Sequence, residues 1–225
     1  MILVAHQPEY LPYLGFFYKV KKADKFIFVD HVQFLEWSFQ NRNKIRTGPG
    51  ENGWIWLTVP IRTKGKGFQK INEVMIDNSR YWGKKHWKSI YYSYKNALFF
   101  SKYKDFFEKI YSQKWERLVD LNETIIRYLF KELGIQIPIY KSSDYNINGR
   151  KNEMIINMCK ELKADTFLSG PGGRQYIKED KFKINRIDHK FSDFTHPVYH
   201  QQFEPFIPNL SIIDFLFNCG GQSLK

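Results

Sequence analysis

Apolar and polar residues alternate in blocks near the start of the chain. Residues 1–5 form a short apolar run, residues 16–22 have a helical pattern, and residues 26–29 form a second apolar run. Short apolar runs bounded by polar turns are typical of buried strands. Strand, helix and strand in this order predict a compact βαβ unit with two parallel strands.

The remaining pattern predicts further strands and a long helical region. Strands are expected at residues 54–60, 71–76, 135–140 and 166–169, with strand and turn at 181–194. Apolar residues recur at helical spacing over residues 82–133, 153–162 and 211–218. The expected fold class is therefore α/β: a mostly parallel central sheet that starts with the βαβ unit, with a helical insertion around residues 82–133. We expect residues 1–225 to form a single domain.

Composition narrows the class of protein. Of the 225 residues, 43% are hydrophobic, and the formal net charge is +12. No apolar stretch reaches about 18 residues and no signal-peptide pattern occurs, so neither a membrane span nor secretion is expected. Cys159 and Cys219 fit neither a disulfide framework nor a metal motif, which favours a reduced, cytoplasmic setting.

The positive charge favours an anionic partner. No compact block of about five or six basic residues occurs, and this disfavours nucleic acid. We therefore expect an anionic small-molecule substrate, such as a sugar nucleotide or an acyl donor. His196 and His200 are close in sequence, but Pro197 prevents the helical spacing of a metal pair, so no metal site is expected.

Polar side chains follow both strands of the βαβ unit. His6 and Gln7 come directly after the first strand, and Asp30 follows the second. Ligands bind beyond the carboxyl ends of strands in open α/β sheets, so His6 and Asp30 are the candidate catalytic residues and Gln7 is a binding candidate. The alternative is that His6 and Gln7 only satisfy hydrogen bonds of their loop.

Three further polar clusters are candidates for binding. The stretch Ser169-Gly170-Pro171-Gly172-Gly173-Arg174 could hold an anion with its N–H groups and Arg174, or form a tight structural turn. It is neither a Walker A loop nor a GxGxxG motif. Asn41 and Arg42 suit sugar hydroxyls or phosphate, although a solvated loop would look the same. Lys85 and His86 lie in an aromatic helix, where a histidine is more often a hydrogen-bonded core residue.

A series of motifs runs in order through nearly the whole chain. They are His6-Gln7-Pro8-x-Tyr10-Leu11-Pro12-x-x-Gly15, Asp30-x-x-Gln33-Phe34, Asn41-Arg42-Asn43, Trp56-Leu57-Thr58-Val59-Pro60, Trp82-x-x-Lys85-His86, Leu168-Ser169-Gly170 with Tyr176, and Tyr199-x-Gln201 before Leu210-Ser211-Ile212-Ile213-Asp214. In this combination the chain resembles the WbqC-like protein family. The resemblance implies an association with bacterial surface-polysaccharide (O-antigen) gene clusters, and a transfer of glycine or another aminoacyl group to a sugar. The motifs add Tyr10, Gln33, Tyr176, Tyr199 and Gln201 as substrate-binding candidates.

The leading hypothesis is an acyl or aminoacyl transferase that acts on an amino-sugar or sugar-nucleotide intermediate. His6 would be the general base on the acceptor, and Asp30 would orient His6 or bind the substrate. Asn41 and Arg42 would hold the sugar or its phosphate. An anionic donor or diphosphate would be bound by Ser169, Gly170 and Arg174.

Two alternatives stay open. A nucleotidyltransferase-like enzyme acting on a phosphorylated substrate would use His6 to steady phosphates, but Glu9 stands where an HxGH motif has its second histidine. A non-catalytic sugar- or nucleic-acid-binding protein would use the basic charge and the aromatic content of 18%. Cys219 could carry a thioester, although nothing near it in the sequence favours a reactive thiolate. The sequence identifies no cofactor.

Overall fold

The computed structural model describes residues 1–63 and 65–223. Contacts between Cα atoms divide the chain into two compact units. The first comprises Met1–Pro8, Gly15–Val32 and Ile135–Thr195, and the second comprises Glu9–Leu14, Gln33–Gly134 and His196–Lys225. Each unit is assembled from segments far apart in the sequence. The single-domain organisation expected from the sequence stays a prediction.

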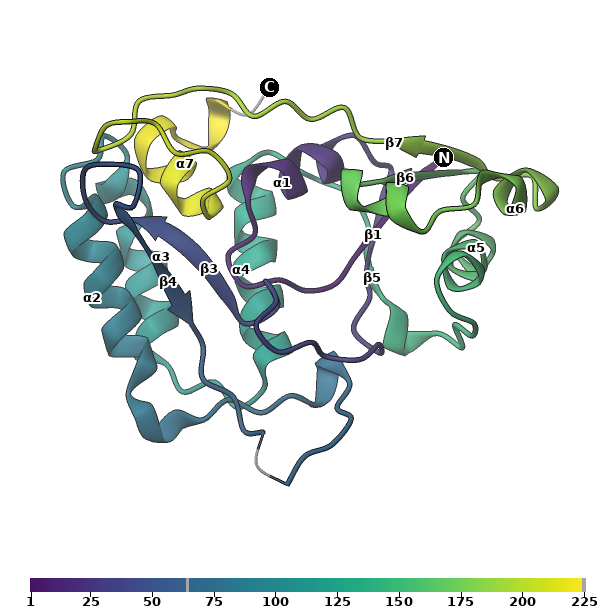
Figure 1. Ribbon diagram of the computed structural model, residues 1–225, viewed down its shortest axis with the longest axis horizontal. Helices are drawn as coiled ribbons and strands as arrows, with labels where there is room; N and C mark the ends of the chain where they lie inside the picture. Colours follow the sequence, from purple (N-terminus) through teal and green to yellow (C-terminus); the bar gives the residue numbers. More distant parts are fainter. Residues whose placement is uncertain (64, 224–225) are drawn as a thin grey trace. The chain divides into compact units, whose positions relative to one another are not determined.

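The first unit contains a five-stranded parallel sheet (Figure 1). Its strands, in the order β5-β2-β1-β6-β7, are β1 (Ile2–His6), β2 (Lys25–Phe28), β5 (Ile139–Lys141), β6 (Thr166–Ser169) and β7 (Asp188–Phe191). The connecting helices are α1 (Leu14–Lys21) from β1 to β2, α5 (Asn152–Glu161) from β5 to β6, and α6 (Glu179–Ile184) from β6 to β7. The predicted βαβ unit and the α/β fold class are confirmed.

The order of the strands creates a topological switch point. From β1 the chain adds β2 and then β5 on one side, whereas β6 and β7 lie on the other side of β1. Because all five strands are parallel, their carboxyl ends share one edge of the sheet. Ligands of open α/β sheets bind at that edge, where the strand order reverses. Here that place lies between the ends of β1 and β6.

Apolar side chains bury the strands of the first unit. Leu3 of β1, Ile27 of β2 and Phe167 of β6 belong to one buried cluster with Met158 of α5 and Phe182 of α6. Parallel sheets are covered in this way, which explains why their strands read as nearly continuous apolar runs.

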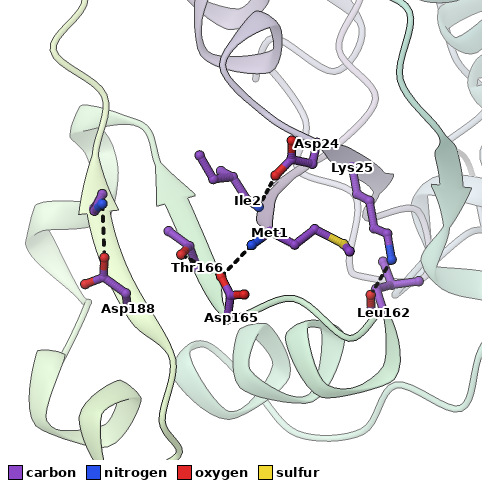
Figure 2. Close-up of polar contacts among 9 residues, drawn as sticks. Met1, Ile2, Asp24, Lys25, Leu162, Asp165, Thr166 and Asp188 are labelled. Atoms are coloured by element: carbon purple, nitrogen blue, oxygen red, sulfur yellow. Dashed lines mark hydrogen bonds and ion pairs between the residues drawn. The ribbon is translucent and has the colours of Figure 1, made fainter.

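Polar contacts hold the amino-terminal edge of this sheet (Figure 2). The ammonium group of Met1 donates to the Asp165 carboxylate at 2.6 Å, and the Ile2 N–H donates to the Asp24 carboxylate at 2.7 Å. The Lys25 ammonium group donates at 2.7 Å to a backbone carbonyl just after α5. These contacts use the polar groups of the edge opposite the candidate site.

The second unit combines an antiparallel hairpin with helices (Figure 1). Its elements are β3 (Arg42–Arg46), β4 (Trp54–Thr58), α2 (Trp82–Tyr94), α3 (Phe100–Ser112), α4 (Leu118–Glu132) and α7 (Ile212–Cys219). A Cβ atom on Gly83 of α2 would lie 2.4 Å from the carbonyl oxygen of Tyr111 in α3, so only glycine permits this close approach. Short 3₁₀ helices occur at Ile71–Glu73, Asn78–Arg80 and Gly221–Ser223 of this unit, and at Ser142–Asp144 and Pro171–Gln175 of the first.

Predicted and observed elements differ in several places, including residues 135–140, of which only Ile139 and Tyr140 lie in β5. Residues 54–60 contain the expected strand, but it pairs with β3, a segment expected as a polar loop, because Arg42 and Lys44 lie over tryptophan rings of β4. Residues 71–76 contain a 3₁₀ helix, followed by an isolated bridge between Ile61 and Ile76. Residues 181–194 include part of α6 before β7. Across the described part of the chain, every helix is too short or too polar to cross a membrane.

Candidate functional site

The candidate residues from the sequence fall into two sets, one in each unit. The first unit holds His6, Gln7, Asp30, Ser169, Gly170, Arg174 and Tyr176. The second unit holds Tyr10, Gln33, Asn41, Arg42, Lys85, His86, Tyr199 and Gln201.

A buried lysine lies at the switch point of the first unit. Lys19 of α1 is only 5% exposed, and its Nζ atom would be 3.8 Å from a Cβ atom placed on Gly170. The charge of Lys19 also acts on His6, at the end of β1. Lys19 thus brings a positive charge to the carboxyl ends of both β1 and β6. An ammonium group in such a position suits an anionic ligand.

Sequence reasoning missed Lys19. Phe16, Lys19 and Val20 share one face of α1, and both apolar neighbours are buried. A single charged residue on the apolar face of a short helix is the signal that could have identified it.

His6 is neutral at pH 7. Burial, followed by the charge of Lys19, lowers its pKa to about 3. Its Nδ1 atom lies 3.0 Å from the carbonyl oxygen of Gln7, and because a carbonyl only accepts, Nδ1 carries the hydrogen. The lone pair of the neutral ring is therefore on Nε2. With so low a pKa, His6 is a weak proton acceptor in this structure.

Asp30 is held by the 3₁₀ helix Ser142–Asp144, which follows β5. Its Oδ1 atom accepts from Ser142 Oγ at 3.0 Å and from the Ser143 N–H at 2.9 Å, and its Oδ2 atom accepts from Ser143 Oγ at 2.7 Å. The side chain is 2% exposed. Asp30 therefore joins the end of β2 to the segment just after β5, and its expected role in orienting His6 stays a prediction.

The glycine-rich stretch forms a tight turn on the sheet. Residues Pro171–Gln175 are a 3₁₀ helix, and a Cβ atom on Gly173 would lie 3.1 Å from the Cβ atom of Ser169. Ser169 Oγ is 2.9 Å from Nε2 of His189 in β7, a pairing the sequence did not indicate. The exposed guanidinium group of Arg174 lies 4.4 Å from the centre of the Phe191 ring. These contacts favour the structural-turn alternative for the glycines.

Tyr176 follows this turn. Its ring is 44% exposed, and its carbonyl oxygen accepts from Asn152 Nδ2 at 2.9 Å. The ring remains accessible to a ligand, whereas the backbone is fixed on α5.

The second unit contains a pocket of about 450 Å³. It brings together three candidates from the sequence, namely Asn41, Lys85 and His86. The pocket is also lined by Trp82, which belongs to the same sequence motif as Lys85 and His86, and by Trp37 and Arg80, which sequence reasoning missed. A volume of this size falls within the range of small-molecule sites.

A chain of hydrogen bonds fixes His86 in the pocket wall. Tyr10 Oη lies 2.8 Å from His86 Nδ1 and 2.6 Å from Tyr111 Oη. A hydrogen bond with the Thr58 backbone raises the pKa of His86, so the ring donates to that backbone; burial has the larger effect and lowers the pKa to about 4. The neutral ring must then accept from Tyr10, and Tyr10 accepts from Tyr111. This order makes Tyr10 a structural partner of His86.

Arg42 is fixed between two indole rings. Its guanidinium carbon lies 5.4 Å from the centre of the Trp37 ring and 4.3 Å from that of Trp56. The neighbouring Asn41 donates from Nδ2 to the Val59 carbonyl at 3.1 Å. Its Oδ1 atom is buried and has no hydrogen-bond partner within the described residues. Asn41 therefore presents unused acceptor capacity beside the pocket.

Tyr199 and Gln201 surround a buried carboxylate. Asp214 accepts from Tyr94 Oη at 2.9 Å, from Tyr199 Oη at 2.9 Å and from Gln201 Nε2 at 2.8 Å. The Gln201 amide also donates to the Ile207 carbonyl and accepts from the Ile207 N–H. The polar groups of Gln201 are thus used within the fold, which gives it a structural position.

The other sequence candidates take simpler positions. Gln33 is exposed and forms an isolated bridge with Lys70. Cys219 ends α7, and burial together with the nearby Asp214 charge raises its pKa to about 11, which disfavours a thiolate nucleophile. Within residues 1–63 and 65–223, no cluster of three His, Cys, Asp or Glu side chains could hold a metal ion.

Comparisons with known proteins place the chain among related sequences. The model of the WbqC-like protein family matches residues 7–225. A curated relative, the uncharacterized protein Rv1507c of Mycobacterium tuberculosis, is 33% identical over 219 residues, which covers 96% of this chain and 93% of the relative. No solved structure gives a significant match.

Proposed function

The chain belongs to the WbqC-like protein family, and from that premise we propose that it is a transferase of surface-polysaccharide biosynthesis. In this proposal it moves an acyl or aminoacyl group onto an amino sugar carried by a nucleotide. The observation that supports it best is the buried Lys19 at the switch point, beside His6 and Gly170.

The position of Lys19 suits the diphosphate of a sugar nucleotide. The ammonium group of Lys19 can donate charge-assisted hydrogen bonds to phosphate oxygens. Gly170 has no side chain that would occupy the space next to Nζ. Doubly wound sheets also bind nucleotides at this edge. The net charge of +12 adds long-range attraction for such a substrate.

His6 would take the proton released in the transfer. The amine of the sugar attacks the carbonyl carbon of an activated acyl or aminoacyl ester or thioester; a C–N bond forms, the C–O or C–S bond of the donor breaks, and the leaving alkoxide or thiolate finally takes up the proton that His6 received from the amine. The proton from the amine would pass to Nε2 of His6, which carries the lone pair of the neutral ring. A negative diphosphate beside Lys19 would offset the second cause of the low His6 pKa, the charge of Lys19, and so make His6 a better base.

Mass spectrometry tests the reaction directly. The protein is incubated with nucleoside-diphosphate amino sugars and with acyl-coenzyme A or aminoacyl donors, and the sugar product should gain the mass of the acyl group. Lys19→Met should weaken nucleotide binding about 10- to 100-fold, because a charge-assisted hydrogen bond contributes about 1.5–3 kcal/mol. His6→Ala should lower the rate and leave nucleotide affinity nearly unchanged.

Lys183→Met is the matched control. Lys183 is an exposed lysine of α6 in the same unit, so its substitution makes the same change in charge away from the switch point. Circular dichroism should confirm that both lysine variants are folded. Full binding and turnover by Lys19→Met, or full turnover by His6→Ala, would show that the assignment is wrong.

Nucleotidyl transfer is a second candidate. The observation that favours it is the doubly wound strand order with a histidine at the carboxyl end of the first strand. It predicts release of pyrophosphate from a nucleoside triphosphate with Mg²⁺, and no acylated product. A pyrophosphate assay on the same samples separates the two reactions.

A further inference from the structure

The second unit carries its own ligand site. We propose that the pocket lined by Trp37, Asn41, Arg80, Lys85 and His86 binds a pyranose sugar that bears a negative group. This inference goes beyond the proposed transfer reaction and does not depend on it, because every residue that carries it lies in the second unit.

Trp37 provides a flat apolar wall. Its side chain is 68% exposed, which is unusual for an indole that has no binding role. Its φ angle is +63°, a left-handed conformation that costs a bulky residue roughly 1–2 kcal/mol. Strained residues of this kind concentrate at ligand sites. The C–H face of a pyranose ring matches such a surface.

Arg42 positions this wall. Its guanidinium group lies over both Trp37 and Trp56, and Trp56 belongs to the regular ladder of β4. Planar stacking of a guanidinium group on aromatic rings is favourable and cannot be reproduced by lysine. Trp37 is therefore attached to a strand through Arg42, which reduces the entropy lost when a sugar binds.

The charges of the pocket favour an anion. Arg80 and Lys85 bring two positive charges, against one negative charge from Glu36. Arg80 shares its charge with Asp77, whose Oδ2 atom lies 3.4 Å from Nε. Lys85 is exposed and is the stronger candidate for direct contact. The neutral His86 adds no charge at pH 7 but offers a fixed polar wall.

Asn41 supplies a specific polar contact. Its buried Oδ1 atom has no hydrogen-bond partner among the described residues, and an unsatisfied buried acceptor costs about 1–3 kcal/mol. A hydroxyl group of a sugar in the pocket would offer the missing hydrogen bond. Aromatic walls, amide groups and basic residues together match the ring, hydroxyls and negative group of an acidic sugar.

Calorimetric titration tests this site with defined probes. Glucuronate and glucose 1-phosphate should bind with Kd values of order 1 mM, and neutral glucose at least about 5-fold more weakly. Trp37→Ala should weaken binding about 10-fold, Lys85→Gln about 3- to 10-fold, and Asn41→Ala about 5-fold. Arg42→Lys keeps the positive charge but removes the planar group that lies over Trp37 and Trp56. A loss of affinity together with a change in tryptophan fluorescence would therefore identify Arg42 as a positioning residue.

Two exposed residues of the second unit serve as controls. Tyr92→Ala removes an aromatic ring that is 61% exposed and outside the pocket lining, and Lys104→Gln removes a charge from α3. Both should bind the probes as the unchanged protein does. Any of three results would overturn the proposal. Trp37→Ala binds the acidic probes as tightly as the unchanged protein does, glucose binds as tightly as the acidic probes do, or neither acidic probe binds at about 10 mM. Tighter binding of a short oligonucleotide, with a steep loss of affinity in salt, would overturn it in favour of nucleic acid.

Discussion

Replacing Tyr10 by Phe tests the hydrogen-bond chain behind the pocket. The Tyr10 hydroxyl contacts His86 Nδ1 at 2.8 Å and Tyr111 Oη at 2.6 Å, and all three residues are buried. The substitution keeps the ring and removes only the oxygen. It leaves an acceptor on His86 and a donor on Tyr111 without their partner, at positions that are buried.

The expected cost follows from those two buried groups. An unsatisfied buried polar group costs about 1–3 kcal/mol, so the two groups together predict that Tyr10→Phe lowers the free energy of unfolding by about 2–6 kcal/mol. Tyr111→Phe should cost only about 0.5–1.5 kcal/mol, because Tyr10 still donates to His86. The order of the two costs thus reports the direction of the chain.

Denaturation by urea, followed by circular dichroism, measures both costs and their coupling. The double variant should be less destabilised than the sum of the single variants by about 1 kcal/mol or more, since Tyr111→Phe removes a donor that Tyr10→Phe would leave without an acceptor. Additive costs, or a cost of Tyr10→Phe no larger than that of Tyr111→Phe, would refute the assigned order of donors and acceptors.

Three further predictions concern buried ionisable groups. The pKa of His86 is lowered to about 4, so between pH 6.5 and 4 the unfolded chain binds more protons than the folded protein, and the free energy of unfolding decreases as the pH is lowered. His86→Gln should remove up to about 3 kcal/mol of that decrease. Identical pH profiles for the two proteins would contradict this prediction. Asp214→Asn replaces an acceptor oxygen by an NH₂ group that faces donors, and should lower the unfolding free energy by about 2–4 kcal/mol; a stability equal to that of the unchanged protein would count against the network. Cys219, with its pKa raised to about 11, should react with a thiol reagent at pH 7.5 far more slowly than free cysteine, as followed by absorbance; rapid labelling of the folded protein would contradict this.

In the first unit, the sequence predicted the positions of some candidate residues but not the hydrogen-bond partners of others. His6 and Gly170 lie at the switch point as their places after strands suggested, because parallel strands bring their carboxyl ends to one edge. The partners of Asp30 could not be found in the same way. Ser142 is 112 positions further along the chain, and nothing near either residue marks their hydrogen bond.

In the second unit, too, the sequence predicted some features and not others. The apolar spacing of residues 82–133 was sufficient to predict helices there, and α2, α3 and α4 occupy that range. The strand β3 was missed because Arg42 and Lys44 look like loop residues until tryptophan rings cover them. The role of Trp37 was missed as well, since its left-handed conformation has no sequence signal such as glycine.

By itself the sequence determined the types and order of most elements, the α/β class and the family. These features follow from local periodicity, because side chains repeat their direction every two residues in a strand and about every 3.6 in a helix. Only the tertiary structure decided that Lys19 meets Gly170, that Asp30 binds Ser142 and Ser143, and that Trp37 and Arg80 line one pocket. Such contacts depend on how distant segments pack, and packing leaves no periodic pattern in a single sequence.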